Sequence, residues 1–259
     1  DIGGHPGATM LENTITSASG QKDYLDPYFR RGVSMTLRRQ PEGSTSVTAR
    51  WEKHVSAADV VSGTETGFRP VRSVDEGTMA SVTVSSRFDL PLAGSGNVSA
   101  SAGRLQDQNF ASVDGGLTWT FAERDARWNT RASLAGGIMN ADAPAQNMYL
   151  LGGRQTLLGH DYRLFAGNAY WLARLEGTVP VRTPFLGLRA FAVVGSTHLS
   201  DPSALPSSWA ARDSNGLRGT VGLGLSIGWD STYLDVGRAL WGTGWEMMLS
   251  VAPQFRSWL

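Results

Sequence analysis

The sequence predicts an all-β protein: a single-domain transmembrane antiparallel β-barrel of about twelve strands, spanning residues 1–259. Three observations favour this fold class. Apolar and polar residues alternate with a period of two along many segments. Glycine is abundant, at 31 of 259 residues, and only 18% of residues are charged, below the roughly 25% usual in soluble domains. Long and short polar connections also alternate between the segments.

Charge and cysteine content exclude several function classes. The 23 basic and 23 acidic residues cancel, so the net charge favours no nucleic-acid partner. The absence of cysteine excludes a disulfide framework, a thiolate metal site and a cysteine nucleophile, and it fits the periplasm or the cell surface. The longest apolar run, 190–194, lies between Arg189 and Gly195 and is far too short for a membrane-spanning helix.

The alternation is clearest in residues 217–229, where nearly all odd positions are apolar and even positions are polar or glycine. A soluble β-sandwich would show the same period. The barrel is favoured because the segments run to about 10–13 residues against 5–6 in soluble strands, and because Trp and Tyr gather near their ends. The last segment carries a terminal strand signal on one face, formed by Trp245, Met247, Leu249, Val251 and Phe255.

Connection lengths set the topology. Three long connections, 58–77, 140–167 and 198–214, alternate with short turns, which in outer-membrane barrels places the long ones outside. Because single-chain barrels use even strand numbers, we expect a further strand before residue 28, around Ala8–Ser17, and both chain ends in the periplasm. The eleven segments expected as strands are 28–39, 45–57, 78–91, 97–104, 110–122, 127–139, 168–181, 185–197, 215–229, 232–241 and 245–255.

Residues 127–259 resemble the bacterial surface antigen superfamily of outer-membrane barrels, which comprises BamA/TamA-like barrels and two-partner secretion transporter barrels. The resemblance rests on five motifs in order: Gly152-Gly153, Gly159, Gly167-Asn168, Glu176 and Pro180. It implies a barrel of about sixteen strands that here lacks its first strands. It also points to a group of loop residues, namely Gly152, Gly153, Arg154, Leu158, Gly159, His160 and Arg163.

In this family the external loop corresponding to 140–167 folds back into the barrel, and its arginine pairs with an acidic residue of the inner wall. Here Leu158 stands at the position of that arginine, His160 at that of an aromatic residue, and Val193 at that of the acidic residue. Both halves of the ion pair are therefore apolar, which is coherent because an unpaired buried charge costs several kcal/mol.

Two interpretations of loop 140–167 follow. It can still fold into the lumen, through packing of Leu158 or through Arg154 or Arg163 reaching Glu176. The alternative is an ordinary surface loop with glycine turns. We expect the inward loop.

Charged residues on the predicted inward faces have two interpretations: a wall of ion pairs that holds the barrel, or a charged pore. Mixed signs favour the wall. The inner-wall positions expected to matter most are four charged residues and one apolar residue, namely Arg174, Glu176, Arg218, Asp235 and Val193. The complete charged set is Arg50, Glu52, Arg87, Asp89, Asp114, Arg131, Arg174, Glu176, Arg189, Arg218 and Asp235.

We expect no metal site, no cofactor and no catalytic residue. The four histidines lack metal-ligand spacing, and no Gly-x-Ser-x-Gly elbow occurs. The expected function is insertion or transport of protein or lipid at the bacterial outer membrane. The expected partners are outer-membrane lipid, lipopolysaccharide and a client or passenger protein. Two alternatives remain: a membrane anchor or secretion barrel for an N-terminal enzyme or passenger, and a lipid-modifying barrel enzyme acting at His198 and Ser200.

Overall fold

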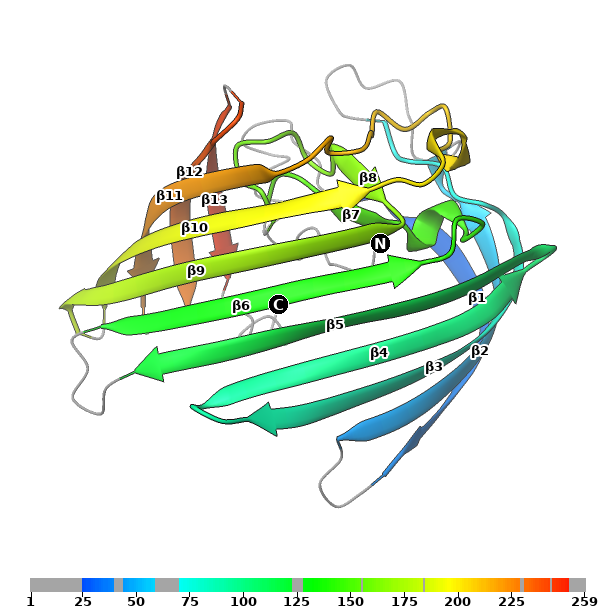
Figure 1. Ribbon diagram of the computed structural model, residues 1–259, viewed down its shortest axis with the longest axis horizontal. Coiled ribbons are helices and arrows are strands. Elements are labelled where there is room, and N and C mark those ends of the chain that lie inside the picture. Colours follow the sequence, from blue (N-terminus) through cyan, green and yellow to red (C-terminus); the bar gives the residue numbers. More distant parts are fainter. Residues whose placement is uncertain are drawn as a thin grey trace.

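The computed structural model describes residues 25–39, 44–58, 70–122, 128–154, 156–183, 185–228, 231–242 and 244–251. Its main element is one antiparallel sheet of eleven strands (Figure 1). In chain order these strands are β1 (Tyr28–Arg38), β2 (Thr45–Ser56), β3 (Gly77–Leu90), β4 (Gly94–Leu105), β5 (Gln108–Ala122), β6 (Asn129–Met139), β9 (Ala169–Arg182), β10 (Leu186–His198), β11 (Arg218–Ile227), β12 (Thr232–Ala239) and β13 (Trp245–Val251).

Every strand of this sheet pairs with the strands next to it in chain order within the sheet, across short turns and long connections alike. The eleven predicted segments correspond one to one to these strands, which confirms the all-β class. The largest differences at a start are three residues: β4 begins at Gly94 rather than at residue 97, and β11 begins at Arg218 rather than at residue 215. The expected further strand around Ala8–Ser17 lies outside the described residues.

The two faces of the sheet carry different side chains. Large apolar residues are exposed on the convex face, including Leu223 and Met247 at 68% each and Trp245 at 66%. A soluble protein rarely leaves so continuous an apolar surface open to water, whereas the hydrocarbon of a bilayer would cover it. In the described part of the chain, no helix has the length and apolar character needed to span a membrane.

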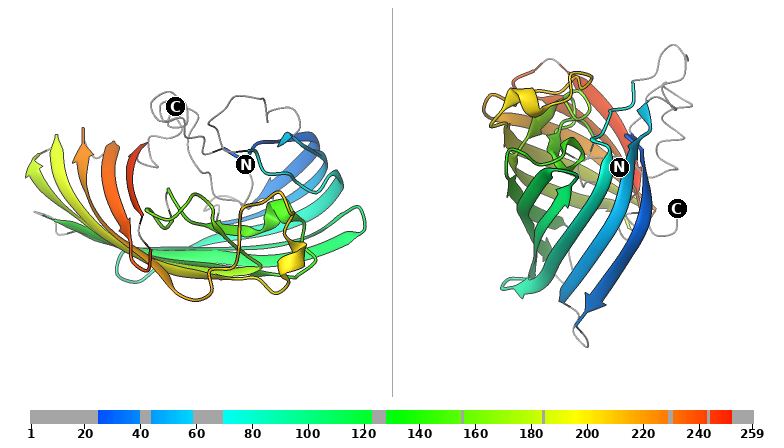
Figure 2. Two further views of the ribbon diagram at one scale, coloured as in Figure 1. Left: turned by 90° about the horizontal axis from the view of Figure 1, so that it is seen from above. Right: turned by 90° about the vertical axis from the view of Figure 1, so that its right-hand side faces the viewer.

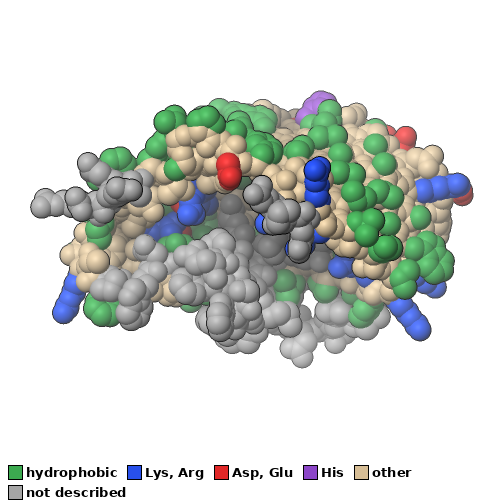
Figure 3. Space-filling model, turned by 90° about the horizontal axis from the view of Figure 1, so that it is seen from below, with side chains coloured by type: hydrophobic (Ala, Val, Ile, Leu, Met, Phe, Trp, Pro, Cys, Tyr) green, Lys and Arg blue, Asp and Glu red, His purple; other side chains and the backbone are tan. Residues whose placement is uncertain are grey.

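The sheet curls around a central space, which we call the lumen (Figure 2). Within the described residues β1 and β13 are its two edges and do not pair with each other, so the barrel is not closed there. Figure 3 shows basic side chains in the hollow of the molecule and hydrophobic ones around the outer wall.

The loop between β6 and β9 enters the lumen. It holds the 3-10 turn η1 (Ala145–Asn147) and a hairpin of two short strands, β7 (Tyr149–Leu151) and β8 (Phe165–Gly167). A second 3-10 turn, η2 (Pro202–Ala204), lies between β10 and β11. The larger buried apolar cluster joins residues of the loop with inward residues of the wall, so the core lies inside the curved sheet.

Replacing Leu223 by Arg should reduce the stability of the protein in lipid vesicles by about 2–4 kcal/mol, because a charge would face hydrocarbon near the middle of β11. Ser112→Arg is the control, since Ser112 lines the lumen beside Asp114, and it should change stability by about 0.5 kcal/mol or less. Equal losses for the two variants in urea titrations would contradict the lipid-facing assignment.

Thr220 would not serve as a control, although the alternation alone predicts that Thr220→Arg is tolerated. Its side chain is completely buried beneath the loop, and its hydroxyl donates a hydrogen bond to the carbonyl of Leu158 at 2.8 Å. Arginine at this position would displace the loop, so that expectation is wrong.

Candidate functional site

The candidate site is the loop of residues 140–167, which we call the lumen loop. Most of its apolar side chains are buried, and Leu157 has no exposed surface at all. Each such leucine contributes about 1.5–3 kcal/mol relative to an exposed one. The buried apolar residues of the hairpin and its tip are Tyr149, Leu150, Leu151, Leu157, Leu158, Phe165 and Ala166. The structure thus places the loop inside, rather than on the surface.

Three glycines give the lumen loop its path. Gly152, Gly153 and Gly159 all have positive φ, at 116°, 69° and 92°, a conformation that other residues adopt at a cost. At Gly159 space is limiting as well, because a Cβ atom would lie 2.7 Å from the backbone nitrogen of Ala239. A Cβ atom on Gly244 would in turn overlap the carbonyl oxygen of Gly159. The loop therefore meets the β12–β13 turn backbone to backbone.

Leu158 lies next to this contact. Its side chain fills the space above Gly237, where a Cβ atom would be 2.8 Å from Leu158 Cδ2. It belongs to the same buried apolar cluster as Val193, so both positions of the ion pair that the resemblance implies are apolar and buried here.

Polar groups of the loop also reach the wall. The Arg154 guanidinium donates to the carbonyl of Leu249 on β13, and His160 Nε2 lies 3.2 Å from the carbonyl oxygen of Gly219 on β11. Arg163 reaches Asp26, just before β1, at 2.9 Å. The expectation that Arg154 or Arg163 would reach Glu176 is therefore wrong: Glu176 is engaged by arginines of the wall itself.

A buried cluster of charges holds the lumen loop at that end of the barrel where the long connections lie. Asp26 Oδ2 accepts from Arg72 Nη1 at 2.7 Å and from Arg163 Nη1 at 2.9 Å, and Asp26 is fully buried. Arg72 Nη2 also donates to the carbonyl of Arg163 at 3.1 Å. Such dense pairing offsets the several kcal/mol that burial of each charge costs. Asp26 and Arg72 were not predictable from the sequence, because no motif marks residues that meet only in the folded chain.

The inner-wall positions singled out by the sequence fall into two places. Arg174 and Glu176 on β9 form an ion pair of 3.0 Å, and Arg189 on β10 links Glu176, at 3.3 Å, to Asp235 on β12, at 3.4 Å. Arg218 lies elsewhere: its Nε donates to the carbonyl of Ser214 at 2.8 Å, and its guanidinium lies 5.5 Å from the ring centroid of Phe165 in the lumen loop.

On the terminal strand β13 the alternation is visible as exposure. Trp245 and Met247 are exposed on the outer face, while Leu249 and Val251 are half-buried. Phe255 lies outside the described residues. On the inner face, Glu246 Oε2 accepts from the backbone N–H of Gly159 at 3.3 Å, so β13 also contacts the lumen loop through a side chain.

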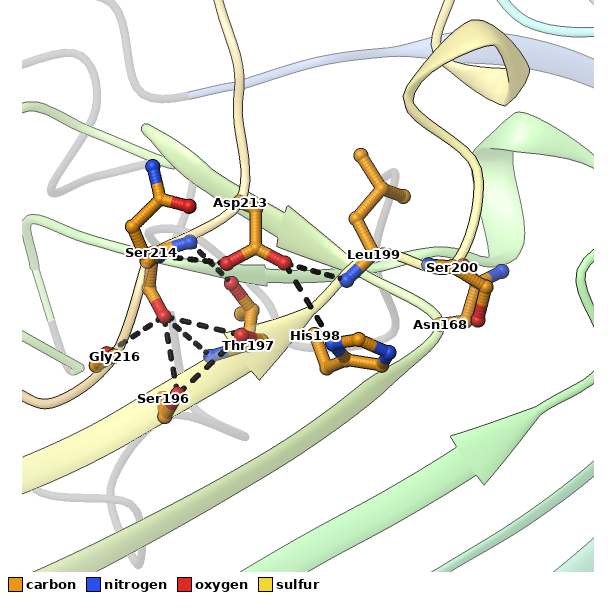
Figure 4. Close-up of polar contacts among 10 residues, drawn as sticks. Asn168, Ser196, Thr197, His198, Leu199, Ser200, Asp213, Ser214 and Gly216 are labelled. Atoms are coloured by element: carbon orange, nitrogen blue, oxygen red, sulfur yellow. Dashed lines mark hydrogen bonds and ion pairs between the residues drawn. The ribbon is translucent and has the colours of Figure 1, made fainter.

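His198 and Ser200 do not form a nucleophile and base pair (Figure 4). His198 Nδ1 is 3.9 Å from Asp213 Oδ2, but its side chain is 75% exposed. Ser200 is held through its backbone N–H by Asn168 Oδ1 at 3.0 Å, and no contact joins its hydroxyl to His198. Asp213 instead accepts from the backbone N–H of Leu199 at 2.7 Å, so the group ties the connection between β10 and β11 to the end of β10.

In the part of the chain that the structure describes, no three His, Asp or Glu side chains come together in a way that could hold a metal ion.

Cysteine labelling tests the position of the lumen loop, because the chain has no other cysteine. Leu158 is 3% exposed, so Leu158→Cys should resist a water-soluble maleimide in the folded protein and react after denaturation. The control Ser207→Cys, in the exposed connection between β10 and β11, should react at once. Equal labelling rates would place the loop outside.

A pH titration tests the contact of His160. Burial lowers the pKa of its imidazole below the usual 6.5, although the hydrogen bond to Gly219 acts in the opposite direction. The folded state then binds the proton less readily than the unfolded chain, so the protein loses stability as the pH falls through the unfolded pKa. His160→Asn should lose less stability than the wild type between about pH 7.5 and about pH 5, measured by urea unfolding. The exposed His198→Asn is the control, and an identical loss in all three proteins would contradict the assignment.

Comparison with known proteins bears on the fold. No protein-family model matches the chain, and no curated protein sequence does. Among solved structures, BamA from Haemophilus ducreyi lacking POTRA domains 1–3 is similar with a TM-score of 0.58 at 16% identity, over 86% of this chain and 53% of that one. CdiB from Acinetobacter baumannii is similar with a TM-score of 0.56 at 16% identity, over 86% of this chain and 41% of that one. The chain thus spans about half of the length of these structures or less, and it has the fold of outer-membrane β-barrels such as BamA and CdiB.

Proposed function

We propose that the protein is an outer-membrane barrel of the BamA/TamA-like assembly and translocation type, in which the lumen loop moves during insertion or transport of protein or lipid. The observation that carries the proposal is the packing of the lumen loop against β11–β13, through the contacts of Leu158 and Gly159. A loop held inside a barrel limits what passes through it. The proposal assigns no catalytic chemistry to the chain.

The loop and the last strand are arranged to move together. Within the described residues β13 pairs with β12 alone. The loop contacts β13 through Arg154 and through the backbone of Gly159. Displacement of the loop would therefore remove contacts that hold β13 on its inner side.

This proposal includes partners and a location. Outer-membrane lipid and lipopolysaccharide would cover the exposed apolar face, and a client or passenger protein would use the lumen. The end of β13 lies on the side of the short turns, which supports a periplasmic position for that side.

A second function, a membrane anchor or secretion barrel for a passenger, is favoured by one observation. The buried cluster of Asp26, Arg72 and Arg163 ties the lumen loop to the chain just before β1, which is the other edge of the described sheet from β13. A loop fixed in this way suits a barrel that only holds its cargo in the membrane.

A reversible tether distinguishes the two functions. Leu158 and Gly237 lie close enough for a Leu158→Cys/Gly237→Cys pair to form a disulfide. If the loop is a gate, the oxidised pair should remove the channel openings of the barrel in planar lipid bilayers, and a reductant should restore them. Leu158→Cys alone is the control for oxidation, and the reduced double variant is the control for the two substitutions, because Gly237→Cys beside an intact Leu158 would displace that side chain. Openings that are the same in oxidised and reduced protein would contradict the gate and favour the anchor.

A further inference from the structure

A polar cavity lies in the lumen near the short turns, on the wall rather than at the lumen loop. Among the described residues it has a volume of about 470 Å³, and its charged lining residues are Arg131, Arg174, Glu176, Arg189 and Asp235. They come from four strands, β6, β9, β10 and β12, so the curvature of the sheet brings them together.

Three guanidinium groups converge on one carboxylate. Glu176 Oε2 lies 3.0 Å from Arg174 Nε and 3.3 Å from Arg189 Nη2, while Glu176 Oε1 lies 3.5 Å from Arg131 Nη1. Among the described residues the second carboxylate, Asp235, forms an ion pair with Arg189 alone, at 3.4 Å. The lining therefore holds three positive groups against two negative ones, and ion pairing within the wall leaves one positive charge uncompensated.

Exposure follows a gradient across the three arginines. The side chain of Arg189 is 5% exposed, that of Arg174 is 22% exposed and that of Arg131 is 45% exposed. A guanidinium carries five N–H donors, and the only ion pair of Arg131 within the described residues uses Nη1. Its other donors remain for a group that enters the cavity from water.

Neighbouring packing keeps the arginines in place. The Arg189 guanidinium lies 3.7 Å from the ring centroid of Tyr233, and that of Arg174 lies 5.3 Å from the ring centroid of Phe191. A Cβ atom at Gly224 would overlap Asp235 Oδ1, so glycine at this position makes room for the carboxylate that holds Arg189. The donors are thus preorganised, which lowers the entropy lost when a ligand binds.

We propose that this cavity is a binding site for small oxyanions of the phosphate class, with Arg131 and Arg174 as the donors that meet the ligand and Arg189 as the buried charge behind them. Rings of arginine select anions and phosphate in pores, and the fork of a guanidinium matches two oxygens of a phosphate group. The site lies on wall strands, so the proposal does not depend on motion of the lumen loop.

Calorimetric titration of the whole detergent-folded protein with inorganic pyrophosphate tests the site without requiring an open channel. The wild type should bind saturably, and Arg131→Gln and Arg174→Gln should each weaken binding about tenfold or more. Arg50→Gln is the matched control, because Arg50 lines a different lumen cavity and its loss should leave the affinity unchanged. Arg131→Lys should retain part of the affinity, since it keeps the charge but loses the fork.

Phosphate could arrive free in solution or on a lipid headgroup. A parallel titration with phosphatidic acid in mixed micelles separates these sources: tighter binding of pyrophosphate favours a dissolved ligand, and tighter binding of phosphatidic acid favours a headgroup. The proposal would be overturned if the wild type bound neither pyrophosphate nor phosphatidic acid saturably. Equal affinities in wild type, Arg131→Gln and Arg174→Gln would overturn it as well. Cooperative unfolding of each variant, measured by circular dichroism, verifies that a loss reflects the site and not misfolding.

Discussion

Gly159 and Gly244 bring the backbone of the lumen loop against the backbone of the β12–β13 turn at a separation that leaves no room for a Cβ atom on either residue. The other contacts of the loop tip depend on this approach. It places the Leu158 side chain over Gly237 and the Leu158 carbonyl within hydrogen-bond distance of Thr220. It also brings His160 Nε2 to the carbonyl oxygen of Gly219. A larger residue at either glycine would lift the tip, and these contacts would be lost together because each is short in range.

The fold could be predicted from sequence because a β-barrel wall is specified locally. Alternation decides which face of a strand meets lipid, and connection length decides the order of the hairpins. Both properties can be recognised within about a dozen residues of the chain, as in 217–229 and the turn that follows. Closure of the barrel depends instead on what pairs with β1 and β13, which no local pattern specifies.

The site was only partly predictable for the same reason. The glycines at 152, 153 and 159 mark a loop with unusual backbone angles, and their effect is local. The partners of Arg154 and Arg163 are not local: they are a carbonyl on β13 and a carboxylate before β1. Thr220 illustrates the limit of alternation, which indicates that a residue faces inward but not what occupies the space in front of it.

The pair between Asp26 and Arg163 has a consequence for the order of folding. The two residues are 137 positions apart, so their contact closes one of the longest loops in the described chain. Closing such a loop costs more chain entropy than forming any hairpin of the wall, and contacts of this kind form late. The hairpins from β1 to β6 can form before the lumen loop is in place, whereas the loop contacts residues at both edges of the sheet, Asp26 before β1 and Leu249 on β13. The barrel should therefore pass through a state in which the wall is formed and its interior is still open to water.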